Sequence, residues 1–575
     1  MKTKGPLLSI ILVIILLFSS TSILNASDSV VPEVGALLQN SYVDPVPEQV
    51  LNAPSVEEML ERLGDPHTTY FSATDYANFI NSLDMRFSGI GIYVDIVSDG
   101  VLITSVIPGS PAEQVGLKKN DIIIQAGTQI LAGLPLETAT SYIRGLDGSA
   151  LDIKVKRGTQ NFDVTVIRRT INIPTVTGEV LDGHIGYIKL NTFGSDSATL
   201  FGEVLNKLKA AAVNRWIIDL RDNPGGYVSS VIDIAGYFIG SNDVVQFKGR
   251  SGLTEIYAAP DHGSILNQPI IFLTNKNSAS ASEILTAAAK DYAKATLVGT
   301  RTYGKGSVQS MFPLSDGGTL KMTIAHFFSP LGHAIDKVGI TPDLPITTTD
   351  ALTTAQLMLI NTGQGDPNPQ SGDIKFQAGP NTFTIQLGQA RKPEYWSAFN
   401  EILSNVESPT LNFEQWGNET WSIVTTELNT RWRLLYPNYR NYGTMTEVSL
   451  AKNFVITFSR PVSASSVTNQ SVELIDTLSG ERILLDFNPI NETAIQVTPR
   501  QPLKPNSTYW FIVHSIVQGT SGQSLKVGTL LIVKTVETKA GALGLTSKLG
   551  PDNNAVNLPD YGQAISDKAK GAKYN

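Results

Sequence analysis

Thr274-Asn-Lys-Asn-Ser-Ala-Ser-Ala-Ser-Glu283 is the stretch that decides how the centre of this 575-residue chain folds. An apolar run, residues 269–273, comes directly before it, and an Ala-rich helical pattern, residues 283–289, overlaps its end. A buried strand, a corner of small residues and a helix are therefore expected in this order. Strands that alternate with helices indicate an α/β core.

The same alternation runs through residues 171–350, which we expect to form one core. The other strand candidates there are residues 185–190, 216–220 and 296–298, and the helical patterns cover residues 197–212, 228–238 and 282–293. Asp316-Gly-Gly318 predicts a hairpin turn before the apolar stretch 320–328.

The corner places a serine hydroxyl at a helix N-terminus, where free backbone N–H groups face developing negative charge. Lys305 lies 25 residues after Ser280, between Gly304 and Gly306. A serine is a poor nucleophile until a base takes its proton, and a desolvated lysine can be that base. The layout is that of a hydrolase that pairs Ser280 with Lys305.

Each segment alone also has an ordinary structural interpretation. Serines at such corners cap helices, and a Gly-Lys-Gly loop forms solvated turns. A phosphate-binding loop is rejected: Gly299, Gly304 and Lys305 have the spacing of that motif, but Gly306 replaces the Ser or Thr that would hold Mg²⁺.

Composition excludes several other functions. The chain has no cysteine, which excludes disulfides and thiol catalysis, and its net charge of −8 gives no reason to expect nucleic acid. None of the six histidines lies in a motif that marks a catalytic base, and no His/Asp/Glu group has metal-ligand spacing. No metal and no cofactor are therefore expected.

Six blocks in order resemble the C-terminal processing peptidases (tail-specific proteases), a family of Ser-Lys endopeptidases that contain a PDZ domain. The blocks are residues 63–71, 87–92, 219–226 (Asp-Leu-Arg-Asp-Asn-Pro-Gly-Gly), 277–283, 304–309 (Gly-Lys-Gly-Ser-Val-Gln) and 339–343. The resemblance therefore covers residues 63–343, and it implies an exported serine endopeptidase with this family's fold and site.

The resemblance assigns three catalytic residues. Ser280 matches the nucleophile, and it is the middle of three neighbouring serines, Ser278, Ser280 and Ser282. Lys305 matches the general base. Gln309 matches the residue that orients the lysine amine, which a neutral amide can do without raising the lysine pKa.

The oxyanion needs two N–H donors in place before charge develops. The expected donors are the backbone N–H of Ala281 and that of Gly225 or Gly226. Asp291 matches an acidic position of some family members, and we assign it a supporting role. His333 stands where many relatives carry Arg.

Residues 86–170 alternate in the manner of short strands, with a helical pattern at residues 136–143. They are expected to form a PDZ domain inserted before the peptidase core. Such domains capture a peptide by β-augmentation, and backbone N–H groups hold its terminal carboxylate. The matching loop is Ser88-Gly89-Ile90-Gly91, which leads into a strand that begins at Ile92.

The first 26 residues have the features of a signal peptide or an N-terminal anchor. Lys2 and Lys4 precede an uncharged segment, whose strongly apolar part is nine residues long, 10–18. We therefore expect an extracytoplasmic protein. Ser55-Val-Glu-Glu58 is a capping box, and residues 28–85 are predicted to be a helical region. The resemblance to the C-terminal processing peptidases implies that this region supports the core or forms a homodimer.

Beyond the core the composition changes. Residues 362–440 begin with a Gly- and Pro-rich linker and cannot be assigned to a fold. Residues 441–537 show seven short strand patterns separated by turns, which predict a β-sandwich similar to bacterial Ig-like domains. Residues 538–575 lack apolar periodicity and are expected to be a flexible tail.

Two functions are compatible with these features. The first is an exported endopeptidase that recognises substrate proteins through their C-terminal tails. The second is a catalytically inactive surface scaffold that binds through its PDZ and Ig-like domains, with a cell-surface partner for the C-terminal domain. The joint presence of Ser280, Lys305 and Gln309 favours the protease.

Overall fold

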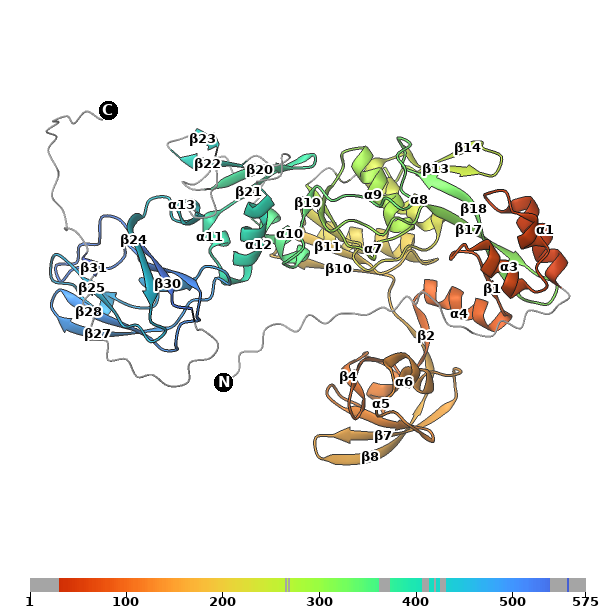
Figure 1. Ribbon diagram of the computed structural model, residues 1–575, viewed down its shortest axis with the longest axis horizontal. Coiled ribbons are helices and arrows are strands. Elements are labelled where there is room, and N and C mark those ends of the chain that lie inside the picture. Colours follow the sequence, from red (N-terminus) through yellow and green to blue (C-terminus); the bar gives the residue numbers. More distant parts are fainter. Residues whose placement is uncertain are drawn as a thin grey trace. The chain divides into compact units, whose positions relative to one another are not determined.

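The computed structural model describes residues 30–263, 266, 269–360, 373–405, 413–417, 420–423, 431–537 and 556–557 (Figure 1). The chain divides into two compact units, Met1–Pro345 and Ile346–Asn575. The predicted targeting segment, residues 1–26, lies outside the described residues. So does the predicted tail, 538–575, apart from two residues.

The α/β core expected for the first unit is present. Its sheet has the strand order β10-β11-β12-β15-β16-β19, with β10 antiparallel to β11 and the other neighbours parallel. The strands are β10 (Val176–Leu181), β11 (Ile185–Leu190), β12 (Arg215–Asp219), β15 (Ile270–Thr274), β16 (Thr296–Gly299) and β19 (Leu344–Pro345). Every residue of β12 and β15 is buried, as continuous apolar runs require in parallel sheets.

Three helices pack against this sheet: α7 (Ser197–Ala210), α8 (Val228–Ile239) and α9 (Ala281–Asp291). The predicted succession of strand, small-residue corner and helix corresponds to β15, residues 275–280 and α9. The strand ends one residue after the apolar run, at Thr274, and the helix begins directly after Ser280. The corner therefore lies at the carboxyl edge of the parallel sheet, where α/β proteins place their sites.

A second sheet joins the core to the N-terminal region. It has the order β1-β18-β13-β14, and β17 also pairs with β18. Its strands are β1 (Thr69–Phe71), β13 (Asp243–Gly249), β14 (Thr254–Ala258), β17 (Ser307–Pro313) and β18 (Thr319–Phe328). β1 comes from the N-terminal region and pairs antiparallel with β18, so the predicted helical region is integrated into the first unit.

The N-terminal helices are α1 (Val31–Ser41), α2 (Glu48–Leu51), α3 (Val56–Leu63) and α4 (Ala73–Leu83). Ser55 caps α3 by accepting a hydrogen bond from the Glu58 N–H at 3.2 Å, as the sequence predicts. Apolar residues of α1 and α3 share one cluster with Leu320 and Met322 of β18.

The PDZ fold predicted for residues 86–170 is present. Its elements are β3 (Ile92–Val97), β4 (Gly100–Val106), α5 (Pro111–Gln114), β5 (Ile122–Ala126), β6 (Gln129–Ile130), α6 (Leu136–Ile143), β7 (Ala150–Arg157) and β8 (Gln160–Ile167). The strands form one sheet with its own apolar cluster. β2 (Arg86–Gly89) and β9 (Arg169–Asn172) pair antiparallel where the chain enters and leaves the domain.

This pairing corrects one detail of the sequence prediction. Ser88 and Gly89 do not belong to a loop but to β2, because they pair with Thr170 and Arg169 on the returning strand. Only Ile90 and Gly91 connect β2 to β3.

The second unit begins with a small mixed region that the sequence left unassigned. The part of this region that the structure describes contains a sheet of the order β21-β20-β22-β23 and four helices. The elements are α10 (Ala351–Leu359), β20 (Ile374–Ala378), β21 (Asn381–Ile385), α11 (Leu387–Ala390), α12 (Pro393–Ser404), β22 (Phe413–Gly417), β23 (Thr420–Ile423) and α13 (Arg431–Leu435). The carboxylate of Glu401 on α12 accepts N–H bonds from Thr347, Thr348 and Thr349 and ties the start of the unit to this region.

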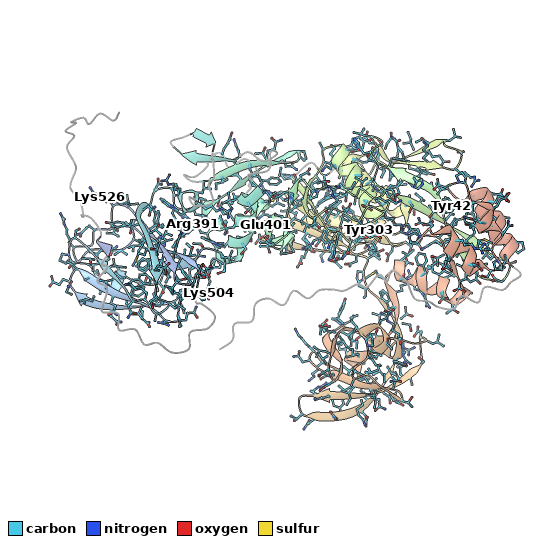
Figure 2. All side chains as sticks on the ribbon, viewed as in Figure 1. Tyr42, Tyr303, Arg391, Glu401, Lys504 and Lys526 are labelled. Carbon is cyan, nitrogen blue, oxygen red and sulfur yellow. The ribbon has the colours of Figure 1, made fainter. Side chains whose placement is uncertain are left out.

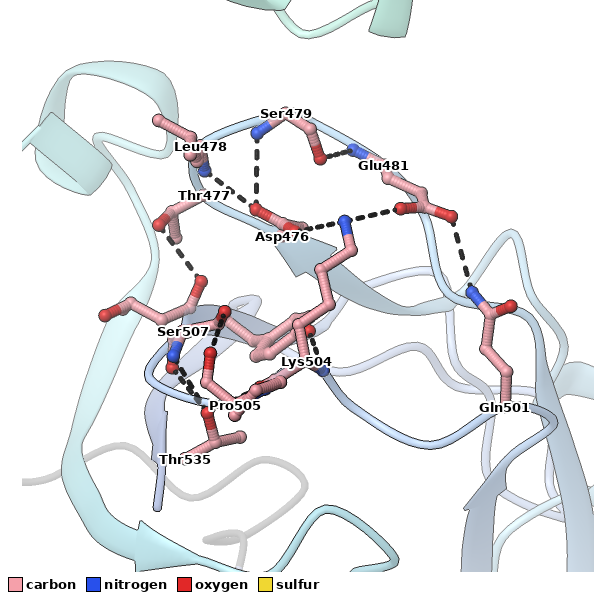
Figure 3. A network of polar contacts seen from close by, with 12 residues as sticks. Asp476, Thr477, Leu478, Ser479, Glu481, Gln501, Lys504, Pro505, Ser507 and Thr535 are labelled. Atoms are coloured by element: carbon pink, nitrogen blue, oxygen red, sulfur yellow. Dashed lines mark hydrogen bonds and ion pairs between the residues drawn. The ribbon is translucent and has the colours of Figure 1, made fainter. Parts of the chain in front are cut away.

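The predicted β-sandwich follows, with two sheets of orders β24-β30-β29-β26 and β27-β28-β25-β31 around one apolar cluster. Its strands are β24 (Arg440–Val448), β25 (Phe454–Thr457), β26 (Val472–Asp476), β27 (Leu485–Asn491), β28 (Ala494–Pro499), β29 (Thr508–Val513), β30 (Thr529–Thr535) and β31 (Val556–Asn557). At one end the Lys504 ammonium bridges Asp476 and Glu481, each at 2.9 Å (Figure 3).

Candidate active site

The three neighbouring serines differ in what their hydroxyls do. Ser278 is fully buried and donates to the Leu220 carbonyl at 2.8 Å. Ser282 is also fully buried, and it donates to the Asn223 carbonyl at 2.9 Å. No described residue accepts a hydrogen bond from Ser280 Oγ, and Ser280 is partly exposed. Of the three, only Ser280 has a hydroxyl proton left for chemistry.

The backbone of Ser280 is held in an unusual conformation. Its φ is +57° and its ψ −113°, outside the regions that a serine favours. Gly225 packs against it, and a Cβ on Gly225 would lie 2.8 Å from the Ser280 Cβ and 2.9 Å from the Ala281 nitrogen. Strain of this kind persists only where the surroundings enforce it, and it gathers at functional sites.

Lys305 lies in the loop between β16 and β17, two residues after Tyr303 (Figure 2). Burial, together with the nearby charge of Lys321, lowers the pKa of Lys305 to about 8. Asp65 and Glu283 act in the opposite direction. An amine with this pKa is neutral in an appreciable fraction of molecules near neutral pH, as a general base requires.

Glu283 connects the serine segment to the lysine segment. Its fully buried carboxylate accepts N–H bonds from Ser280 at 2.9 Å, Gly304 at 2.7 Å and Lys305 at 2.8 Å, and the Thr302 hydroxyl at 2.6 Å. Burial raises the pKa of Glu283 even with these four donors. Glu283 was not among the residues predicted from the sequence, although its position three residues after a serine at a helix N-terminus could have indicated a role.

Gln309 lies on β17 opposite Thr323 of β18. Its Nε2 donates to the Ser307 hydroxyl at 2.9 Å and lies 3.4 Å from Thr323 Oγ1. Among the described residues no hydrogen bond links Gln309 to the Lys305 amine, so its predicted orienting role stays a prediction.

The candidate oxyanion donors are not equivalent. The Gly225 N–H is already bonded to Asn223 Oδ1 at 2.9 Å. The N–H groups of Gly226 and Ala281 have no acceptor in the described part of the chain. Ala281 is the first residue of α9, where a helix leaves its N–H groups free. Ala281 and Gly226 are therefore the better pair.

Asp291 is the last residue of α9. Its carboxylate accepts the Leu331 N–H at 2.9 Å and lies 3.1 Å from the His333 ring. His333 therefore pairs with Asp291. Neither residue has a described hydrogen bond to Ser280 or Lys305.

The N-terminal region contributes ionisable groups around Lys305, two of them from residues 63–71. Burial and the charge of Lys305 lower the pKa of His67. Asp65 accepts hydrogen bonds from Thr68 and Thr323. Burial, together with Asp65, raises the pKa of the Tyr42 hydroxyl, which follows α1 (Figure 2).

The PDZ residues lie at the start of that domain. Ile90 is buried in its core, and the Ile90 and Gly91 carbonyls accept N–H bonds from Ala112 and Ile107. The N–H groups of Ile90 and Gly91 have no acceptor among the residues that the structure describes. Two free N–H groups before an exposed strand edge can hold an anionic group.

The described residues contain no group of three or more acidic or histidine side chains that could hold a metal ion. None of their helices is long and apolar enough to cross a membrane.

The fold and these motifs define a PDZ-containing peptidase. Residues 184–346 match the model of peptidase family S41, residues 88–167 that of the PDZ domain and residues 443–530 that of a bacterial Ig-like domain. The chain is 34 % identical over 346 residues to the carboxy-terminal processing protease CtpB of Bacillus subtilis (strain 168), covering 59 % of this chain and 71 % of that protein. The chain belongs to the carboxy-terminal processing protease family.

Two further proteins are similar to parts of the chain. The carboxy-terminal processing protease CtpA of the same organism is 31 % identical over 309 residues, covering 53 % of this chain and 66 % of that protein. Among solved structures, the photosystem II D1 C-terminal processing protease is 23 % identical with a TM-score of 0.39, covering 58 % of this chain and 95 % of that one.

Proposed function

We propose that this chain is an endopeptidase in which Ser280 is the nucleophile and Lys305 the general base. The observation that supports this most is the Glu283 carboxylate, which fixes the backbone of both residues through hydrogen bonds of 2.9 and 2.8 Å. The free hydroxyl of Ser280 and the lowered pKa of Lys305 give each residue the property that its role needs.

The reaction would proceed in two stages. The neutral Lys305 amine takes the Ser280 proton while Oγ attacks the scissile carbonyl carbon, and the Ala281 and Gly226 N–H groups hold the resulting oxyanion. The carbon–nitrogen bond then breaks, and Lys305 gives its proton to the leaving amine. Water, activated by the same lysine, hydrolyses the ester on Ser280 and restores the site.

The PDZ domain would select substrates through their C-termini. The free N–H groups of Ile90 and Gly91 would bind the terminal carboxylate, and the last residues would pair with β3. Export, a homodimer formed by the N-terminal region and a surface partner of the Ig-like domain stay predictions from the sequence.

The test is mass spectrometry of peptides released from a mixed protein substrate by the purified chain. Ser280→Ala and Lys305→Ala should each abolish cleavage, and the double variant should be no worse, because the two residues act as a unit. Ser278→Ala and Ser282→Ala are the matched controls and should retain cleavage. Full cleavage by Ser280→Ala would exclude the assignment, and absence of cleavage by the wild-type chain would favour the inactive scaffold.

A further inference from the structure

Asp65 lies between α3 and β1, and donors of His67, Thr68 and Thr323 converge on its carboxylate, beside the Tyr42 hydroxyl. It accepts the His67 N–H at 2.9 Å, the Thr68 hydroxyl at 2.6 Å and the Thr323 hydroxyl at 2.7 Å. Although burial opposes ionisation, these hydrogen bonds lower the pKa of Asp65. The side chain is therefore a carboxylate at neutral pH, and a carboxylate only accepts hydrogen bonds.

The ionised Asp65 carboxylate determines which atom of the Gln309 amide can face Thr323. The Thr323 hydroxyl has one proton, and it donates that proton to Asp65, so only lone pairs remain for other neighbours. Gln309 Nε2 lies 3.4 Å from Thr323 Oγ1 and 2.9 Å from Ser307 Oγ. A lone pair attracts an amide NH₂ and repels an amide oxygen, so the Gln309 oxygen must point away from Thr323.

We propose that Asp65 and Thr323 are positioning residues of the protease site, which hold the Gln309 amide with its oxygen toward the Lys305 amine. This inference rests on the proposed function of Ser280 and Lys305. An oxygen there accepts one N–H of the neutral amine and leaves the amine lone pair for the serine proton. An NH₂ in the same place would donate to that lone pair and block proton transfer.

The hydrogen-bond relay from Asp65 through Thr323 to Gln309 also explains why the N-terminal region is part of the peptidase unit. Thr323 is buried in β18, its N–H donates to Thr68 Oγ1 at 3.1 Å, and its carbonyl accepts from Val43. The segment that carries Asp65 is thus attached to the strand that faces Gln309. Without that segment, the Thr323 hydroxyl would lose Asp65, the acceptor that sets its direction.

The experiment measures kcat/KM of the full chain on fluorescein-labelled casein. Thr323→Val removes the hydroxyl and keeps the shape, and it should lower kcat/KM by about tenfold to a hundredfold, as misplaced catalytic groups do. Thr323→Ser should retain most activity. Thr319→Val, a buried threonine on the same strand, is the matched control and should be unaffected.

A double variant separates positioning from a general structural role. If Thr323 acts through Gln309, the variant with both Thr323→Val and Gln309→Ala should be no slower than Gln309→Ala alone. Thermal unfolding confirms that each variant folds. If Thr323→Val does not fold, Asp65→Asn replaces it in the same comparison.

Asp65→Asn also has a second readout. The charged and titratable groups around Lys305 are Lys321, Asp65, Glu283, His67 and Asp336. Removing the Asp65 charge should move the acid limb of the pH profile to lower pH, whereas Thr323→Val, which keeps the charge, should leave the limb in place.

Three results would overturn the inference: unchanged kcat/KM in Thr323→Val, losses that multiply in the double variant, or wild-type activity of Gln309→Ala. In each of these cases an inactive Ser280→Ala variant would leave the proposed function standing. An active Ser280→Ala variant would instead remove the proposed function, and the inference with it.

Discussion

The Glu283 carboxylate accepts the backbone N–H of Lys305 at 2.8 Å, across 22 residues of sequence. The same carboxylate accepts the N–H of Ser280, so one side chain fixes the separation of the proposed nucleophile and base. Both hydrogen bonds use backbone N–H groups, so neither the Ser280 hydroxyl nor the Lys305 amine is needed to connect the two segments. Both stay free for chemistry, and the buried acid provides the rigidity that a catalytic pair needs.

Replacing Glu283 by Gln should therefore damage catalysis more than its distance from the reacting atoms suggests. An amide can accept with its oxygen, but its NH₂ would face N–H donors that then lose their partner. We expect kcat/KM to fall by about tenfold or more, and the melting temperature to drop, since an unsatisfied buried donor costs about 1–3 kcal/mol. Glu203→Gln, at an exposed position of α7, is the control. An unchanged kcat/KM in Glu283→Gln would show that catalysis does not need the Glu283 carboxylate to hold Ser280 and Lys305.

The rate of proteolysis should rise with pH through about 8, because only the neutral Lys305 amine can take the serine proton. Gln309→Glu would place a negative charge beside the Lys305 amine and favour its protonated form. The rising limb of the pH profile should then move to higher pH. Ser310→Glu, on the other face of β17, should shift the limb less. Equal profiles for wild type and Gln309→Glu would place Gln309 out of contact with the lysine.

Lys305 should also reduce the stability of the fold. Its folded-state pKa is lowered to about 8 from 10.5, so the unfolded chain binds more protons, and the cost is fully present below pH 8 and disappears as the pH rises past 10.5. At pH 7, Lys305→Met should stabilise the first unit by up to about 3 kcal/mol while abolishing activity. Calorimetry checks this, with the exposed Lys276→Met as control. A Lys305→Met variant less stable than wild type at pH 7 would contradict the prediction.

Recognition of substrate C-termini by the PDZ domain can be tested with the Ser280→Ala chain, which should bind without cutting. Peptides selected from a library of free C-termini should lose at least about tenfold in affinity when amidated, because a charge-assisted hydrogen bond is worth about 1.5–3 kcal/mol. Gly91→Ala should abolish binding, since its Cβ would lie 2.2 Å from the Ser110 Cβ. Gly109→Ala, with a similar positive φ but no neighbour within 4 Å, is the control. Equal affinity for acid and amide would exclude carboxylate capture.

Much of the architecture was readable in the sequence because it depends on local patterns. Apolar runs such as β15 and the Ala-rich pattern of α9 specify their own secondary structure. The turn chemistry and strand spacing predicted the PDZ and Ig-like folds. The assignment of Ser88 to a loop failed because its partner, Thr170, comes from the far end of the domain, and no local pattern reports such a pairing.

The sequence by itself determined which residues could form a Ser-Lys pair, since Ser280 and Lys305 have a recognisable spacing and neighbourhood. Only the tertiary structure decided which serine keeps a free hydroxyl. Ser278 and Ser282 donate to the carbonyls of Leu220 and Asn223, which come from a turn nearly sixty residues earlier. The tertiary structure also decided the hydrogen bonds of the Glu283 carboxylate and the relay from Asp65 through Thr323 to Gln309. A hydrogen bond needs its two partners within about 3 Å, and only folding brings distant segments that close.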